Sequence, residues 1–343
     1  MKNFAKFSFL VSVSALMAAC GGGGGGSTAV VTPVVTPTDK TTYTLTNPPA
    51  STYSTDSAQK KMFDTLNQLR IGGGFGALEQ DTRIDQAATA HADYVVTNYF
   101  AGGVPSPDYF TILADGWITA HTELQGMTGY TGARPATRIA LTGYQAISIG
   151  EVLAVEVGLQ AGLAPDMTNC LSRLVNSVFH RAALLDTIYL DVGFGISKPI
   201  FYKNGYIGRA CVINFAAKQA APILAQNWIG IYPFNAQKNV PLLMADEIPD
   251  PVPTSLIKGG PVNIQTSANQ NLVVTSFVLR NAAGLTVPTK LLTKTDTLYL
   301  RSNEAYLIPL GSLIANSEYF VTFEGTSNGM IVSKSWSFGT ESK

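Results

Sequence analysis

Side chains that could do chemistry are few in this chain, and its histidines all lie before the C-terminal third. There are three of them, at positions 91, 121 and 180. His121 and Glu123 stand two residues apart in a stretch without helical periodicity, and such side chains project to the same side of an extended backbone. Glu151 follows an apolar run, where an unpaired carboxylate is costly to bury. Imidazole and carboxylate groups so placed can share a proton or bind a divalent cation.

The other two histidines differ in their setting. His91 lies on the apolar face of a predicted helix over residues 83–98, which is typical of a core histidine with one hydrogen-bonded ring nitrogen. His180 belongs to a predicted helix over residues 168–185. If that helix is continuous, His180 lies about 180° from its apolar stripe and faces either solvent or a cleft.

Hydrophobic patterning predicts the elements that hold these groups. A first helix ends at the glycines of residues 72–74, and the helices over 83–98 and 168–185 follow it. Strands are then predicted at 192–197, in a hairpin turning at Asn204-Gly205, and around Cys211. Helices followed by an antiparallel hairpin predict an α+β layered domain over residues 55–218.

The C-terminal part of the chain differs from the first part in its predicted secondary structure, which is loop and strand. Residues 219–260 are rich in proline and loop-like, which predicts a connector. Residues 261–343 consist of short β-runs, which predicts a small antiparallel sandwich. The predicted strands are 262–266, 272–279, 297–300, 319–324 and 331–338. The end of this part resembles bacterial Ig-like modules through Trp336-Ser337-Phe338, and it holds no His or Cys.

The first twenty residues predict a lipoprotein signal peptide cut before Cys20. Two lysines precede a short apolar run that is too short to span a bilayer, and Ala-Ala-Cys ends it. Secretory cleavage without a lipid is the alternative. A lipid on Cys20 would anchor the protein, and Gly21 after it favours the outer membrane, facing the periplasm or the cell surface. Residues 21–54 predict a flexible tether rich in Gly, Thr and Pro.

Cys170 and Cys211 remain as an even pair in an exported chain. A disulfide between them would close a loop of about 40 residues and stabilise the fold by roughly 4 kcal/mol. Two buried free thiols are the alternative.

The composition of the chain bears on which partners it can bind and on whether it folds. Lysine plus arginine number 23, as do aspartate plus glutamate. This balance gives no electrostatic reason to expect nucleic acid as a partner. The hydrophobic fraction of 46% excludes disorder over the whole length.

Several motifs, in order, resemble the CAP (SCP-like, cysteine-rich secretory protein) superfamily, in its bacterial extracellular lipoprotein branch. Leu-Asn-Gln-Leu-Arg at residues 66–70 and His-Ala-Asp-Tyr at residues 91–94 look like its opening helices. Gly150-Glu151 matches the start of its Gly-Glu-Asn motif, although Val152 replaces the Asn. Residues 177–181 resemble its Ser-x-x-His-Arg motif. The resemblance covers about residues 55–218 and implies a three-layer α-β-α sandwich.

The resemblance also implies a central cleft lined by two histidines and one or two acids. Carried over by motif and order, these are His121, Glu151 and His180, and Glu123 is a local candidate for the further acid. His121 and His180 are then the tentative ligands of a divalent metal such as zinc. His121 is assigned by its order in the chain, since it stands well after the helix.

No Gly-x-Ser-x-Gly elbow is present and no cysteine is free if the disulfide forms, so the sequence leans against an enzyme. We expect a membrane-anchored extracytoplasmic protein that binds a small apolar or lipid ligand, or a cell-envelope component, through the cleft. The alternative is a zinc-assisted hydrolase of peptide or envelope substrates with Glu151 as base. A purely structural role in the envelope is the third hypothesis.

Overall fold

The computed structural model describes residues 46–47, 50–100, 106–158, 167–202, 205–220, 223–253 and 257–343. They belong to one compact unit, Thr41–Lys343. The predicted signal peptide, Cys20, most of the tether and Asn204 lie outside the described residues. Within the described part, no helix is long and apolar enough to cross a membrane.

A five-stranded sheet forms the centre of the first half of the molecule. Its order is β1-β3-β5-β2, and β4 pairs with β5. The strands are β1 (Glu79–Gln80), β2 (Ser148–Gly158), β3 (Asp191–Ile196), β4 (Ile200–Phe201) and β5 (Ile207–Ala217). β5 pairs antiparallel with β2, β3 and β4, while β1 runs parallel to β3. Residues of β3 and nearly all of β5 are buried, as expected for strands that are covered on both faces.

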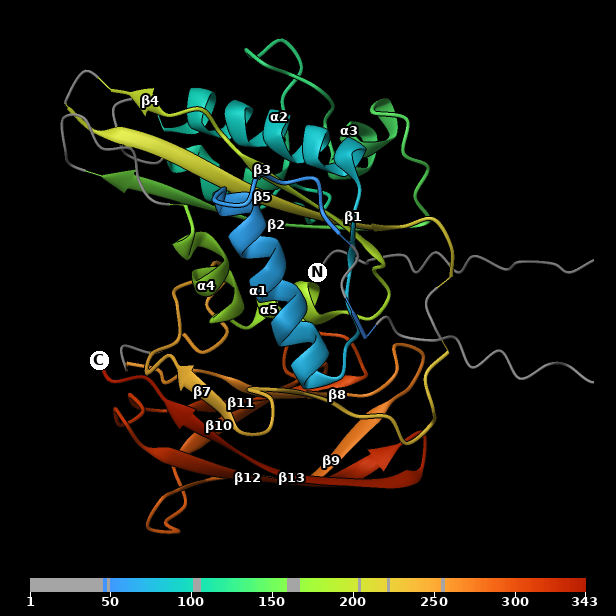
Figure 1. Cartoon of the computed structure of the whole chain (residues 1–343), viewed down its shortest axis with the longest axis vertical. Coiled ribbons are helices and arrows are strands. Elements are labelled where there is room, and N and C mark those ends of the chain that lie inside the picture. The colour runs from blue at the N-terminus through green and yellow to red at the C-terminus, as the bar shows by residue number, and fades with distance from the viewer. Residues whose placement is uncertain are drawn as a thin grey trace, which may run out of the picture. The chain divides into compact units, whose positions relative to one another are not determined.

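Helices cover both faces of this sheet (Figure 1). α2 and α3 lie on one face, and α1, α4 and α5 lie on the other. The helices are α1 (Ala58–Gly73), α2 (Thr82–Tyr99), α3 (Pro135–Leu141), α4 (Asn169–Val175) and α5 (Phe179–Leu185). Short 3₁₀ turns, η2 (Pro107–Phe110) and η3 (Thr119–His121), interrupt the long segment between α2 and α3. The structure is therefore mixed α/β, with helical layers around the first sheet.

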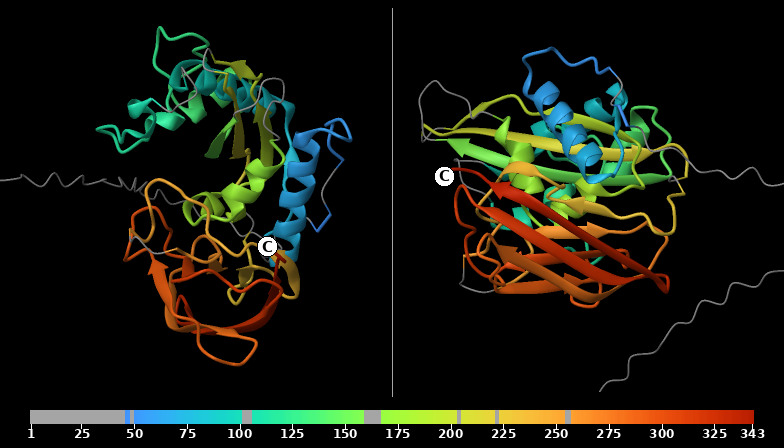
Figure 2. Two further views of the ribbon diagram at one scale, coloured as in Figure 1. Left: turned by 90° about the vertical axis from the view of Figure 1, so that its left-hand side faces the viewer. Right: turned by 60° about the horizontal axis from the view of Figure 1, so that its bottom comes forward.

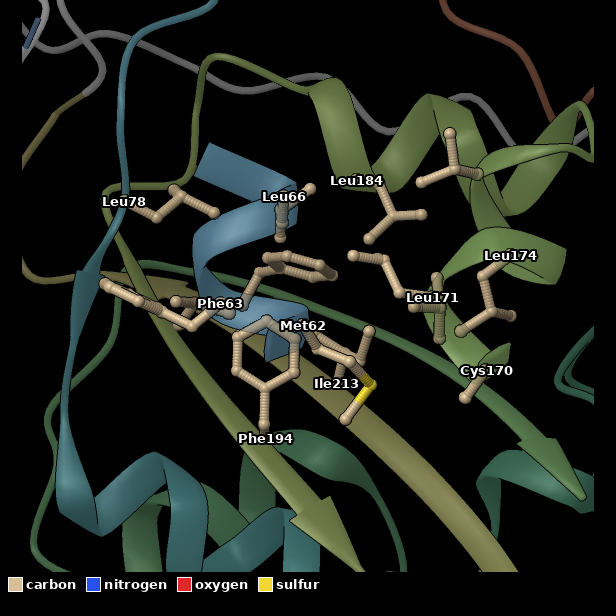
Figure 3. Close-up of a cluster of buried hydrophobic side chains, with 14 of the residues drawn as sticks. Met62, Phe63, Leu66, Leu78, Cys170, Leu171, Leu174, Leu184, Phe194 and Ile213 are labelled. Atoms are coloured by element: carbon tan, nitrogen blue, oxygen red, sulfur yellow. The ribbon is translucent and has the colours of Figure 1, made fainter. Parts of the chain in front are cut away.

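Sequence details explain how the two long helices are held. α1 begins at Ser57, whose side chain accepts a hydrogen bond from the backbone N–H of Lys60, and it ends at Gly74 in the left-handed conformation. α2 packs closely on β3 because Gly195 has no Cβ, which would overlap the backbone of Ala88. The core between α1, α4 and the sheet is aromatic and aliphatic (Figure 3), and Phe63 and Phe194 meet edge to face in it.

The prediction of one helix over residues 168–185 is wrong, because the chain breaks between α4 and α5. At the break, the side chain of Asn176 donates a hydrogen bond to the carbonyl of Leu243, and the N–H of Ala245 donates to the carbonyl of Asn176. The first N–H groups of α5 bind a carboxylate of Glu247. These partners lie far along the chain, so helical periodicity alone gave no sign of the break.

A disulfide joins Cys170 of α4 to Cys211 of β5, which confirms the predicted pairing. It fastens the layer that contains α4 to the central strand of the sheet. Both cysteines are fully buried, so the bond forms part of the core.

Two four-stranded sheets make up the C-terminal part, and its strands run from orange to red in Figure 2. One sheet has the order β10-β11-β8-β6 and the other β7-β13-β12-β9. The strands are β6 (Gly230–Tyr232), β7 (Gln237–Val240), β8 (Val262–Gln265), β9 (Leu272–Asn281), β10 (Thr289–Thr293), β11 (Glu304–Pro309), β12 (Glu318–Ser327) and β13 (Met330–Thr340). Residues from both sheets share one apolar core that contains Trp336. The Ig-like assignment and the domain boundaries remain predictions.

Two strand predictions need correction. Residues 297–300 form a turn, and Leu298 within it is 86% exposed, whereas the fully buried run of β11 follows it. The segment 219–260 is not loop throughout, because β6 and β7 lie in it and pair with C-terminal strands. Their short lengths hid them among the prolines.

Candidate functional site

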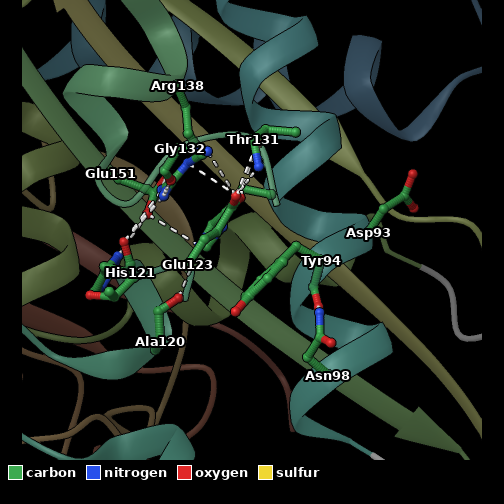
Figure 4. A network of polar contacts seen from close by, with 12 residues as sticks. Asp93, Tyr94, Asn98, Ala120, His121, Glu123, Thr131, Gly132, Arg138 and Glu151 are labelled. Atoms are coloured by element: carbon green, nitrogen blue, oxygen red, sulfur yellow. Dashed lines mark hydrogen bonds and ion pairs between the residues drawn. The ribbon is translucent and has the colours of Figure 1, made fainter. Parts of the chain in front are cut away.

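A buried polar network surrounds Glu151 of β2 (Figure 4). One of its carboxylate oxygens lies 3.0 Å from Nδ1 of His121 at the end of η3. The other accepts a hydrogen bond at 2.7 Å from a guanidinium nitrogen of Arg138 in α3. Only 1% of the Glu151 side chain is exposed, whereas 19% of the His121 side chain is. A strand, a 3₁₀ turn and a short helix thus converge to hold one carboxylate and to leave an imidazole at the surface of a cleft.

Glu123 belongs to the same network but faces away from the cleft. Its oxygens accept hydrogen bonds from the backbone N–H groups of Thr131 and Gly132 and lie 3.0 Å from Nδ1 of His91. The Glu123 side chain is fully buried, and it lines neither of the cavities described below. Its local role is to fasten the loop after α2.

His91 is more than the core histidine that its helical position predicted. Its Nδ1 faces a carboxylate oxygen of Glu123, and its Nε2 lies 2.9 Å from the carbonyl oxygen of Ala120. Both partners only accept, so both bonds form together only when both ring nitrogens carry protons. The buried groups then sum to two positive charges, on His91 and Arg138, and two negative charges, on Glu123 and Glu151.

This balance keeps the carboxylates ionised. Burial alone would raise the pKa of Glu151, but the charges of Arg138 and His91 and the bond from His121 hold that pKa well below its usual range. The pKa of Glu123 is also lowered, because the bonds from His91 and Thr131 outweigh the effect of burial. An ionised Glu151 accepts from His121, so His121 carries its proton on Nδ1.

The second cleft histidine has a partner that sequence reasoning missed. Nδ1 of His180 lies 2.9 Å from the hydroxyl oxygen of Ser177 and 3.2 Å from a carboxylate oxygen of Glu247. The Ser177 hydroxyl donates to the carbonyl of Leu174, so it accepts from the imidazole. Glu247 stands in a proline-flanked stretch, and the one available signal was the acidic pair Asp246-Glu247 before Ile248-Pro249.

Two cavities meet at these histidines. One has a volume of about 270 Å³ and the other about 330 Å³, and His121 and His180 line both. Glu151 lines the second. The structure therefore brings together three of the four predicted site residues, His121, Glu151 and His180, and leaves Glu123 outside. The first cavity is walled mostly by apolar side chains. They are Phe100, Tyr109, Phe110, Ile118, Ala120, Leu153, Ala154, Val155, Leu174 and Ile248.

The arrangement does not form a Ser-His-acid relay. In such a relay the serine and the acid bind opposite ring nitrogens, but Ser177 and Glu247 both face Nδ1 of His180. Ser177 is also buried. Among the described residues, no group of three or more His, Cys, Asp or Glu side chains is placed to hold a metal ion.

Comparison with known proteins leaves the family open. No family model matches the chain, and no curated protein matches it. Among solved structures, it is similar to an outer surface protein from Borrelia burgdorferi. The identity is 20%, over 49% of this chain and 97% of that one, with a TM-score of 0.32.

A second similar structure is an extracellular protein containing a SCP domain from Bacillus anthracis str. Ames. The identity is 18%, over 47% of this chain and 40% of that one, with a TM-score of 0.28. Both scores are too low for either likeness to support an assignment of fold or function.

Proposed function

We propose that this chain is an exported, membrane-anchored protein of CAP type that binds a small apolar ligand in the cleft at His121 and His180. The observation that carries the proposal is the first cavity, whose walls are mostly apolar and whose polar groups are few and converge. Sites for small molecules have this composition, because apolar walls bind the ligand's body and a few polar groups fix its orientation.

The histidines indicate what polar group the ligand carries. Nδ1 of His121 donates to the carboxylate of Glu151, and Nδ1 of His180 donates to the Ser177 hydroxyl with a Glu247 oxygen 3.2 Å away. In the neutral ring the other nitrogen, Nε2, is then an acceptor. Neither Nε2 has a hydrogen bond to the described residues. A ligand with a hydroxyl or amine hydrogen satisfies them. An anion meets these acceptors and the carboxylate of Asp246, while Arg173, the cation in the lining, is paired with Glu156.

The zinc hydrolase is the weaker alternative. Both oxygens of Glu151 are already occupied, one by His121 and one by Arg138, so Glu151 does not fit as a third metal ligand beside the two histidines. Structural and catalytic zinc sites take at least three protein ligands. We therefore derive no step through a metal.

The proposal also includes export of the protein and a lipid anchor at Cys20. A buried disulfide suits an oxidising compartment, and the first twenty residues predict the lipid on Cys20. In cell fractionation, Cys20→Ser should move the protein from the membrane to the soluble fraction. A variant that stays with salt-washed membranes contradicts the lipid anchor.

A neutral fluorescent probe tests ligand binding. N-phenyl-1-naphthylamine is apolar and carries one N–H donor, and its emission rises in apolar sites. Ala154 lines the first cavity, and Ala136 is exposed on α3. We expect saturable binding of about one probe per chain, lost in Ala154→Phe because the ring fills the cavity and kept in Ala136→Phe. Equal binding by both variants, or none by the unaltered chain, contradicts the proposed function.

A further inference from the structure

We propose that Glu247 is a positioning residue of the cleft and that its segment, between β7 and β8, forms one wall of the ligand cavity. The cleft is then complete only when the C-terminal part of the chain is docked. The wall's role in ligand binding rests on the proposed function, whereas the action of Glu247 on His180 does not.

Glu247 is held at the start of α5 by several donors. Its carboxylate accepts hydrogen bonds from the backbone N–H groups of Val178 at 2.6 Å, Phe179 at 2.9 Å and His180 at 3.4 Å. Its side chain is fully buried. Free N–H groups at a helix start favour a negative charge. Among the described residues, no Lys or Arg side chain forms an ion pair with Glu247, so the backbone N–H groups provide most of its stabilisation.

The same carboxylate fixes the tautomer of His180. The Ser177 hydroxyl oxygen accepts from Nδ1, and a carboxylate oxygen of Glu247 lies 3.2 Å from the same nitrogen, so its negative charge favours a proton on Nδ1 and Nε2 keeps its lone pair. The imidazole is 23% exposed and has no other described partner that sets its orientation. Glu247 thus determines which ring nitrogen is left for a ligand, without itself contacting the ligand.

The neighbours of Glu247 form the wall. Asp246 and Ile248 line the first cavity, and Ile248 and Pro249 line the second. Tyr299, from the turn between β10 and β11, also lines the second cavity. The walls therefore come from both parts of the chain.

Further contacts hold the two parts together near the cleft. Arg181, next to His180, is fully buried and donates hydrogen bonds to the carbonyl of Pro261 and the side chain of Asn263. Its guanidinium also lies over the ring of Tyr232. Because a ligand in the cleft would touch both parts, its binding stabilises their docked arrangement.

Two substitutions separate the roles of charge and shape. Both Glu247 oxygens face backbone N–H groups, so the carboxamide of Glu247→Gln always directs its NH₂ at a donor. Glu247→Ala removes every bond to α5. Asp250→Asn is the matched control, because Asp250 belongs to the same segment but binds Val252 and Lys258 instead.

The experiment is NMR of the full exported chain labelled with ¹⁵N at histidine, together with N-phenyl-1-naphthylamine titration. With three histidines, each ring gives its own pattern. In the unaltered chain we expect a pure Nδ1–H form of His180. In Glu247→Ala and Glu247→Gln this pattern should change to a tautomer mixture or to Nε2–H, while the His91 and His121 patterns stay and show that the fold is intact. Probe affinity should fall about tenfold, and Asp250→Asn should match the unaltered chain.

Two failures are distinguishable. If His180 keeps its Nδ1–H form in Glu247→Ala with the other histidines unchanged, the positioning role is wrong. If His180 responds but the unaltered chain binds no probe, Glu247 positions His180 and the proposed ligand function is wrong. If all three histidine patterns collapse in Glu247→Ala, the Glu247→Gln spectrum decides, since that variant keeps the size of the side chain.

Discussion

The buried carboxylates around Glu151 and the buried Glu304 of the C-terminal part have different electrostatic surroundings. In the first part, Glu123 and Glu151 are matched by Arg138 and His91, and their pKa values are lowered. In the C-terminal part, burial raises the pKa of Glu304 to about 7. Glu304 accepts a hydrogen bond from the N–H of Arg301, but the Arg301 guanidinium pairs with Asp186 instead.

Glu247 connects the two parts of the chain. It comes from the C-terminal part, yet the groups that stabilise it are N–H groups of α5 in the first part. Beside the cleft, the ionised Glu151 accepts from His121 and so orients that imidazole. Buried Glu304, away from the cleft, has no such partner, and burial favours its neutral form.

The largest expected effect comes from removing the cation of the network. Arg138→Met leaves the buried carboxylates of Glu123 and Glu151 without their arginine partner. Removing one partner of a buried ion pair costs about 3–5 kcal/mol of unfolding free energy. Urea unfolding followed by circular dichroism measures this. Arg173→Met is the control, because Arg173 is half exposed and pairs with Glu156 near the surface, and it should cost less than about 1 kcal/mol. Equal losses in both variants would show that the network adds nothing beyond a surface pair.

We expect the substitution Glu304→Gln to have a smaller effect of opposite sign, which raises the free energy of unfolding. The pKa of Glu304 is about 7 in the folded chain and about 4.3 in an unfolded one. The folded state therefore binds the proton more tightly, and Glu304 lowers stability progressively as the pH rises from about 4.3 to 7, by roughly 3–4 kcal/mol in all. Glu304→Gln keeps the acceptor for Arg301 and should be more stable than the unaltered chain above neutral pH and similar to it at about pH 4.

Unfolding free energies of Glu304→Gln and of the unaltered chain, measured across this pH range, test whether Glu304 lowers stability as the pH rises. For Glu151 the linkage runs the other way, because its lowered pKa adds stability that is lost as the pH falls below about 4.3. If Glu304→Gln is less stable than the unaltered chain above neutral pH, the contrast between Glu304 and the carboxylates around Glu151 is wrong.

Much of the fold followed from the sequence, because it rests on local patterns. Alternating apolar residues around Cys211 predicted the central strand, and the even cysteine pair predicted the disulfide that the structure has. Order and motif placed His121, Glu151 and His180, which line one cavity. Their role in binding remains a prediction.

What the sequence did not reveal depends on distant contacts. Glu247 lies 69 residues from Val178, whose N–H it binds, and no periodicity links two such positions. The same contact breaks the predicted helix over residues 168–185. His91 was predicted as a core residue from its helix face, but its partners, the Glu123 carboxylate and the Ala120 carbonyl, come from the segment between α2 and α3, whose course the helix does not determine.

The most direct test of the proposed ligand class compares two head groups on one chain length. 1-Octanol and octanoate compete for the site against N-phenyl-1-naphthylamine at a pH where octanoate is ionised. Because both cleft imidazoles present an acceptor at Nε2 and Asp246 lies beside them, we predict that 1-octanol displaces the probe at a concentration at least about tenfold lower than octanoate does. Displacement by octanoate at an equal or lower concentration would contradict a cleft built for a hydrogen-bond donor.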